Sequence, residues 1–102
     1  MIRVTVSYPA AADQRFDHAY YQVEHRQLLQ ELLSGHGLDR VEIDKCLANG
    51  SGGAPDVVAA AHLIFDTLQG YQEGMAEHGK PIRADVANYT DIAPQILISE
   101  MT

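Results

Sequence analysis

The chain has 102 residues, of which 46% are hydrophobic and 21% are charged, and this composition predicts one soluble globular domain over residues 1–102. Seven basic and 14 acidic residues give a formal net charge of -7, which would repel phosphate backbones and anionic membranes. We therefore expect no nucleic-acid partner and no membrane partner. The amino terminus shows no export signal, and a lone cysteine, Cys46, excludes an internal disulfide, so we expect a cytoplasmic protein.

The chain begins with a strand pattern and continues into an amphipathic helix. Hydrophobic and polar residues alternate strictly over residues 2–8, which predicts a strand with one buried face. Residues 16–33 predict a helix that Asp17 caps and that Gly35 and Gly37 end. At about 100° per residue, the inward side of this helix carries Tyr21, His25, Leu28 and Leu32. A histidine therefore lies in the middle of an apolar stripe.

Two further strands and a hairpin connection follow. Residues 38–48 alternate and predict the second strand, and the glycine-rich residues 49–55 predict a flexible hairpin connection. The third strand, residues 56–65, is apolar on both faces, so both of its faces need cover. His62 lies on the opposite face from Phe65. If Phe65 packs beneath the helices, His62 faces a partner molecule.

A second helix is predicted after the third strand. Asp66 or Thr67 caps this helix, and it ends after about residue 78, at Gly79. Each interior glycine destabilises a helix by about 1 kcal/mol relative to alanine, so we expect Gly70 and Gly74 where something packs close or where the helix is loosely held. The inward side of this helix carries Leu68, Tyr71, Met75 and His78.

A short helix and a last strand complete the chain. Pro81 starts the short helix, which runs through about residue 87, and residues 94–100 predict the strand. With right-handed crossovers this order gives an α+β fold, the ferredoxin-like βαββαβ arrangement with four antiparallel strands and helices on one face. The other face of the sheet stays bare, and the third strand is apolar on that side too. We therefore expect a homodimer in which two copies pack their sheet faces together.

Three segments of the chain resemble the EthD family: RFDHAYYQVEHRQL, AHLIFDTLQGY and AEHGKPIRADVANYTDIAPQILISE. The family is named for a bacterial ether-degradation cluster, and the resemblance covers nearly the whole chain in the family's order. It implies the dimeric α/β-barrel fold, and related members are small catabolic or polyketide-tailoring proteins, among them reductases, cofactor-free oxygenases and isomerases. Gln27 departs from the family, which usually has proline there, and this lets the helix continue unbroken past His25.

Histidines and tyrosines on the inward faces predict a small-molecule site. We expect His25 and His78 to converge as catalytic residues on one cavity between helices and sheet, because imidazole moves protons well near neutral pH. Small residues on the third strand and in the helix leave room for an aromatic or polyketide-sized ligand. The expected substrate-binding residues are Tyr20, Tyr21, Tyr71, Tyr89 and His62. His18 and His36 are expected to face water. Asp85 could orient a histidine or face water, and the second role is favoured.

Two functions of different class remain open. The first is a cofactor-free oxidoreductase, oxygenase or isomerase acting on a small apolar or aromatic substrate, with His25 as general acid or base. The second is a non-catalytic small-molecule-binding or accessory dimer, in which His25 is a core histidine satisfied by a backbone carbonyl. We expect no metal, because the histidines are far apart in sequence, and no cofactor. Haem ligation by His25 or His78 stays open, because related dimeric α/β barrels bind haem.

Overall fold

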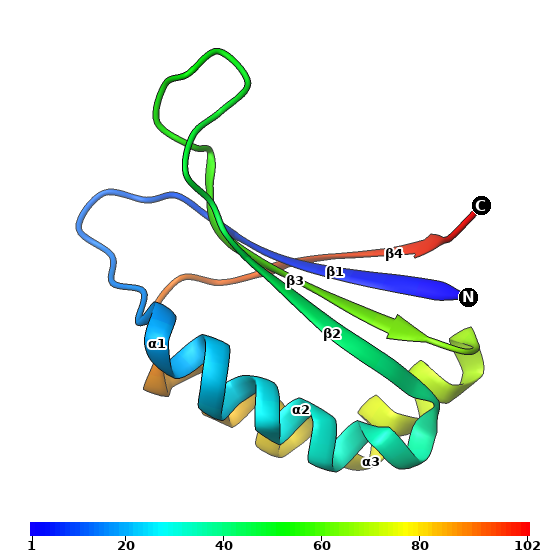
Figure 1. Ribbon diagram of the computed structural model, residues 1–102. Helices are drawn as coiled ribbons and strands as arrows, with labels where there is room; N and C mark the ends of the chain where they lie inside the picture. The colour runs from blue at the N-terminus through cyan, green and yellow to red at the C-terminus, as the bar shows by residue number, and fades with distance from the viewer.

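The computed structural model describes residues 1–102, which form one antiparallel sheet with all helices on one face (Figure 1). The sheet has four strands in the order β2-β3-β1-β4, with the bounds β1 Ile2–Pro9, β2 Leu38–Lys45, β3 Val57–Phe65 and β4 Gln95–Glu100. This is the ferredoxin-like βαββαβ topology predicted from the order of elements. β2 is shorter than the predicted 38–48, and the glycine-rich connection to β3 projects beyond the sheet (Figure 1).

The first helical segment follows β1 and consists of four consecutive parts: α1 His18–Tyr20, η1 Tyr21–His25, α2 Arg26–Leu33 and η2 Ser34–His36. Asp17 caps its start as predicted, because the Asp17 side chain accepts a hydrogen bond from the Tyr20 backbone N–H at 3.1 Å. Gly37 ends the segment in the left-handed conformation, with φ 86°, which glycine adopts without steric penalty.

The η1 part is a single π-helical turn inside this segment. The backbone N–H of Arg26 donates to the carbonyl of Tyr21, five residues earlier, where an α-helix would bond four residues earlier. The wider turn holds one extra residue. Each later residue therefore takes the place on the helix surface that the residue before it would have in an unbroken α-helix. Leu29 and Leu33 are therefore the fully buried leucines. Leu28 and Leu32, predicted on the inward stripe, are only partly buried, and Leu32 packs against the edge of the core.

The second helical segment is one continuous helix, α3 Leu68–Asp85, followed by the 3-10 turn η3 Val86–Asn88. The predicted end at Gly79 and the predicted new helix at Pro81 are both wrong, because Pro81 lies inside α3. A proline there removes one backbone hydrogen bond. Burial of Gly79 and Ile82 on either side of it holds this part of the helix against the core.

Two glycines let α3 approach the end of the first helical segment closely. A Cβ atom on Gly70 would overlap the carbonyl oxygen of His36, and one on Gly74 would lie 3.0 Å from the Leu33 side chain. A larger residue at either position would push the two segments apart. Gly70 and Gly74 are thus placed where something packs close, the first of the two predicted reasons for them.

The core lies between the helices and one face of the sheet. Cross-strand pairs on that face include Val4 with Leu63 and Tyr8 with Ala59, and all four side chains are buried. Phe65, at the end of β3, is also fully buried on this side. None of the helices combines the length and the apolar character that a bilayer crossing requires.

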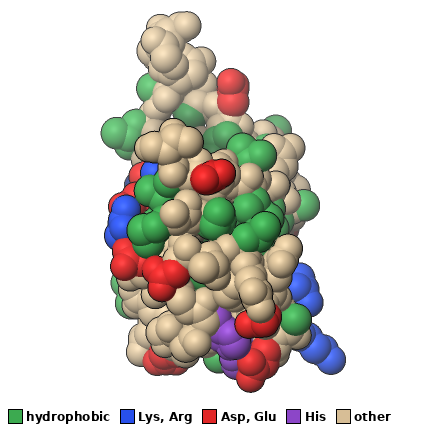
Figure 2. All heavy atoms as spheres, turned by 90° about the vertical axis from the view of Figure 1, so that its right-hand side faces the viewer, with side chains coloured by type: hydrophobic (Ala, Val, Ile, Leu, Met, Phe, Trp, Pro, Cys, Tyr) green, Lys and Arg blue, Asp and Glu red, His purple; other side chains and the backbone are tan.

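The outer face of the sheet is more polar than predicted. Its central apolar residue, Ile64, lies between Arg3 and Arg40 in the strand register and is fully buried. The long arginine side chains can cover such a residue, so the bare apolar face expected from the sequence is absent. Exposed apolar side chains gather instead on the edge strand β4: Ile96, Leu97 and Ile98. Figure 2 shows hydrophobic side chains at the surface of the end of the molecule where the termini lie.

Candidate functional site

One cavity lies between the sheet and α3, with a volume of about 80 Å³. β1 and β3 form its floor, α3 forms its roof, and the π-helical turn closes one side. The walls are almost entirely apolar, with polar atoms supplied by Tyr8, Tyr21, His25 and Tyr71. Arg83 and Ile96 also line the cavity and are exposed, so it opens to solvent between α3 and β4.

His25 reaches this cavity from the π-helical turn and pairs with Asp85. His25 is 4% exposed, and its Nδ1 lies 2.7 Å from Asp85 Oδ2 at the carboxyl end of α3. The second carboxylate oxygen, Oδ1, accepts hydrogen bonds from Tyr20 Oη at 2.6 Å and from Asn88 Nδ2 at 2.9 Å. Of the two predicted roles, Asp85 therefore orients a histidine and does not face water. The partner of His25 is a carboxylate, and not the backbone carbonyl of the alternative prediction.

The electrostatic setting fixes the protonation state of the pair. Burial acts to raise the pKa of Asp85, but hydrogen bonds from Tyr20, His25 and Asn88 outweigh it, and the pKa lies below its ordinary value. Burial lowers the pKa of His25, and Asp85 offsets this only in part. At neutral pH the pair is a carboxylate and a neutral imidazole. Since a carboxylate can only accept, the imidazole proton sits on Nδ1 and Nε2 carries a free lone pair.

Tyrosines surround the other edge of the His25 ring. Tyr89 Oη lies 3.5 Å from His25 Nε2 and shares a hydrogen bond with Tyr8 Oη. Burial raises the pKa of both phenols, so they remain protonated and able to donate. Tyr21 stacks on the imidazole, with ring centroids 5.4 Å apart and an interplanar angle of 17°. Tyr21 and Tyr89 therefore hold the His25 ring, which lines the cavity.

The predicted site residues lie in three places. Tyr21, His25 and Tyr71 line the cavity. Tyr20 and Tyr89 lie behind His25, where Tyr20 binds Asp85 and Tyr89 is fully buried. His62 lies on the outer face of the sheet, as its strand position predicted, and its Nε2 is 2.8 Å from Asp44 Oδ2. The outer face is remote from the cavity, so His62 is not part of this site.

The prediction that His78 shares the cavity with His25 is wrong. The imidazole of His78 lies 5.3 Å from that of His36, centroid to centroid, between α3 and the end of the first helical segment. The physical reason is the close packing at Gly70 and Gly74. His78 follows Gly74 by one turn, so its side chain meets the neighbouring helical segment instead of reaching the sheet. For the same reason His36, which was expected to face water, is only partly exposed.

Sequence reasoning missed Tyr8 and Asn88 as residues of the site, and for Asp85 it favoured solvent exposure over a role in orienting a histidine. Two of the three left a signal in the pattern. Tyr8 lies on the apolar side of the first strand, so a phenol was already predicted to point inward. Asp85 follows the inward Ile82 by three positions, which is the same side of a helix. Asn88 lies in a 3-10 turn where periodicity carries no information.

Comparison with known proteins gives one consistent family. The EthD domain model matches residues 10–93. The structure of an EthD-like protein from Ralstonia eutropha is 41% identical, covers 97% of this chain and 89% of its own, and superposes with a TM-score of 0.90. An ethyl tert-butyl ether D (EthD) family protein from Bacillus halodurans is 17% identical, with coverage of 100% and 99% and a TM-score of 0.78. No curated protein matches the chain.

More distant structures share the fold. A dimeric protein of unknown function with a ferredoxin-like fold, from Bacteroides fragilis, is 12% identical to this chain. The match covers 98% of this chain and 95% of that one, with a TM-score of 0.60. Together with the strand order, this likeness assigns the ferredoxin-like architecture.

Proposed function

The chain belongs to the EthD domain family, and from this premise we propose that it is a cofactor-free enzyme of the isomerase or oxidoreductase type. Its substrate would be a small apolar or aromatic molecule, with His25 as general acid and base. The observation that carries the proposal is the neutral His25 imidazole, which lines the cavity and which Asp85 holds through Nδ1, leaving a lone pair on Nε2. A buried imidazole of this kind is suited to proton transfer near neutral pH.

The proposed step removes a proton from a carbon next to a substrate carbonyl group. The proton moves to His25 Nε2, and the electron pair stays on the substrate as an enolate. Asp85 stabilises the imidazolium that forms, because its carboxylate already accepts the Nδ1 proton. Tyr8 Oη in the cavity wall would donate a hydrogen bond to the enolate oxygen. In a β,γ-unsaturated ketone the enolate extends over the carbon–carbon double bond, so return of the proton to the γ-carbon shifts the double bond and completes an isomerisation.

The cavity volume favours a small substrate or one that extends through the opening. A cavity of about 150 Å³ admits benzene, so the observed cavity of about 80 Å³ encloses only part of an aromatic ring. The rest of such a substrate would lie between Arg83 and Ile96. A porphyrin is several times larger than benzene, and the observed cavity is smaller than one that admits benzene. The site therefore does not fit haem.

A homodimer is part of the same proposal. It is supported by the exposed apolar side chains of β4, and the ferredoxin-like protein from Bacteroides fragilis is described as dimeric. Leu97 points to the outer face of the sheet and is 65% exposed. Replacing Leu97 with Arg would place a charge in the contact, and sedimentation should then show a monomer where the unaltered protein sediments as a dimer. An unchanged sedimentation coefficient would place the contact elsewhere.

The second candidate function is a non-catalytic small-molecule-binding dimer. It is favoured by the complete pairing of the buried polar atoms, since no buried side-chain nitrogen or oxygen lacks a hydrogen-bond partner. In that case His25 and Asp85 would only hold the first helical segment against α3. The two candidates differ in whether the pair exchanges a proton with a bound ligand.

Proton transfer to carbon can be measured without knowing the natural substrate. Small cyclic and aromatic ketones are incubated with the protein in deuterated water, and loss of the α-proton signal is followed by nuclear magnetic resonance. We expect the unaltered protein to accelerate exchange of at least one ketone. His25→Ala should abolish the acceleration while circular dichroism shows a retained fold. His62→Ala removes a carboxylate-paired histidine outside the cavity, and this variant should accelerate exchange as the unaltered protein does.

Two outcomes separate the candidates. Equal acceleration by His25→Ala and the unaltered protein would remove His25 from the mechanism. Ligand-induced shifts in the protein spectrum with no exchange of any bound ketone would favour the binding protein. The ligand can also be sought in protein purified directly from cells. Mass spectrometry of a small molecule that stays bound through purification would identify the ligand class.

A further inference from the structure

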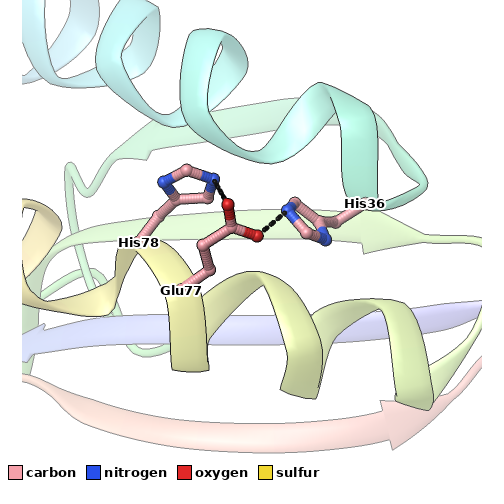
Figure 3. Close-up of side chains that lie close together, drawn as sticks. All are labelled: His36, Glu77 and His78. Carbon is pink, nitrogen blue, oxygen red and sulfur yellow. Dashed lines mark ion pairs between the residues drawn. The ribbon is translucent and has the colours of Figure 1, made fainter.

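Two imidazoles and a carboxylate meet at the surface between the two helical segments, away from the cavity. His36 belongs to η2, whereas Glu77 and His78 are neighbours on α3 (Figure 3). His36 Nε2 lies 3.2 Å from Glu77 Oε2, and His78 Nε2 lies 3.7 Å from Glu77 Oε1. One ligand atom from each residue can be chosen so that all three lie within 4.8 Å of one another. None of the three residues lines the cavity that contains His25.

The glycine contact described above positions this cluster. A Cβ on Gly74 would lie 3.1 Å from His36 Cβ and 3.2 Å from His36 Cγ, so the His36 side chain rests directly on the α3 backbone. His78 is one turn further along the same flank of α3. The two imidazoles are therefore brought together by backbone packing that alanine at Gly70 or Gly74 would disrupt. Figure 3 shows a nitrogen of each ring directed at the carboxylate between them.

We propose that His36, Glu77 and His78 form a binding site for a divalent transition-metal ion of the zinc type. Two imidazole nitrogens with one carboxylate oxygen suit zinc, whereas calcium and magnesium prefer oxygen ligands alone. Tetrahedral zinc with bonds of about 2.0–2.1 Å places its ligand atoms roughly 3.4 Å apart. His36 Nε2 and His78 Nε2 lie 3.2 and 3.7 Å from the two different oxygens of Glu77, and the three ligand atoms lie within 4.8 Å of one another. Side-chain rotations would therefore bring one atom from each residue to the spacing that zinc requires. Water would occupy the fourth position.

The surroundings of the cluster allow an ion to enter. The Glu77 side chain is 64% exposed, and the two imidazoles are partly exposed, so solvent reaches every ligand. Figure 2 shows histidine side chains at the surface with acidic side chains beside them. The net charge of -7 also favours cations over anions near the chain. A bound ion would tie η2 to α3 and stabilise the folded chain by mass action.

Titration of the untagged, metal-free protein with zinc sulfate in a calorimeter tests the proposal. We expect one zinc ion per chain, and at least a ten-fold weaker affinity after His36→Ala, His78→Ala or Glu77→Gln, because each removes one of three ligands. The matched control is His62→Ala, which removes a partly exposed histidine paired with one carboxylate and should bind like the unaltered protein. Circular dichroism checks that each variant is folded.

Cobalt provides a second reading, because cobalt(II) replacing zinc in a tetrahedral site absorbs visible light strongly. We expect the cobalt complex of the unaltered protein to show this absorption, and the His36→Ala and His78→Ala variants to lose it. Zinc should also raise the melting temperature of the unaltered protein more than that of either variant. The absence of saturable zinc binding, or binding that survives both histidine substitutions unchanged, would overturn the proposal. These readings do not depend on whether His25 is catalytic.

Discussion

The chain contains two histidine–aspartate pairs of nearly identical geometry in opposite environments. His25 and Asp85 are 2.7 Å apart beneath the helices, and His62 and Asp44 are 2.8 Å apart on the outer face of the sheet. The side chains are 5% and 13% exposed in the first pair, against 24% and 59% in the second. The contact distance does not distinguish the two pairs. The difference lies in burial and in what surrounds each pair.

Burial gives the inner pair properties that the outer pair lacks. Asp85 is held by two further donors, Tyr20 and Asn88, so its carboxylate is fixed and charged. Burial also keeps the His25 imidazole neutral, and this imidazole lines an apolar cavity. Water competes for every polar atom of the outer pair, and no cavity adjoins it. A histidine–aspartate contact is therefore a candidate for catalysis only when it is shielded from water and lies beside a cavity that can hold a substrate.

Replacing each aspartate with asparagine should show the largest difference between the pairs. Asp85→Asn removes the carboxylate that orients His25 and stabilises its imidazolium, so we expect α-proton exchange to slow by about 10²–10⁴-fold. Asp44→Asn should leave the exchange rate within about two-fold of the unaltered protein, because Asp44 lies on the outer face of the sheet. The rate is measured by nuclear magnetic resonance at saturating ketone. Equal rates in the two variants would remove the special role of the inner pair.

The sequence predicted the architecture better than the site because the two rest on different information. Strict alternation over residues 2–8 and the cap at Asp17 are local patterns, and both were correct. The π-helical turn leaves no local signal, so the inward leucines were shifted by one position. The pairing of His25 with Asp85 joins residues 60 positions apart, which periodicity on each helix separately cannot reveal.

The two glycines show the same limit on α3. Their unfavourable helix propensity correctly indicated a close contact, but not which segment makes it. Without that knowledge, His78 was placed over the sheet instead of against His36. The resemblance to the EthD family was correct over nearly the whole chain, and it identified the fold without locating the partner of either histidine.

Replacing the histidine of each pair with alanine should lower the free energy of unfolding by different amounts, and this difference is the next largest effect that we expect. His25→Ala leaves the mostly buried Asp85 carboxylate without one donor and opens space beside Tyr21, so we expect a loss of about 2–3 kcal/mol in the free energy of unfolding. His62→Ala breaks a partly exposed pair and should cost less than about 1 kcal/mol. Urea unfolding followed by circular dichroism gives both values. Equal losses would mean that burial does not strengthen the inner pair.

The dependence on pH provides a third comparison. The pKa of His25 is lowered from its ordinary value of 6.5 by burial, so the unfolded chain takes up a proton at a higher pH than the folded one. The stability that neutral His25 contributes is present above pH 6.5 and is lost as the pH falls through 6.5 toward the folded pKa. We expect kcat/KM for exchange to fall in the same direction, with its acid limb centred below pH 6.5. A limb centred above pH 6.5 would contradict burial as the dominant influence.

The smallest expected effect concerns the hydroxyl groups that support each pair. Tyr20→Phe removes one of the two extra donors to Asp85, which raises the pKa of the carboxylate because that hydrogen bond stabilises the charged form. Asn88 and His25 still hold Asp85, so we expect exchange to slow by only about three- to ten-fold. The matched change is Thr5→Val, since Thr5 Oγ1 lies 3.4 Å from His62 Nδ1 and supports the outer pair. Thr5→Val should leave exchange unchanged. If both variants slowed exchange equally, the hydroxyl of Tyr20 would act on stability in general, and not through the orientation of Asp85.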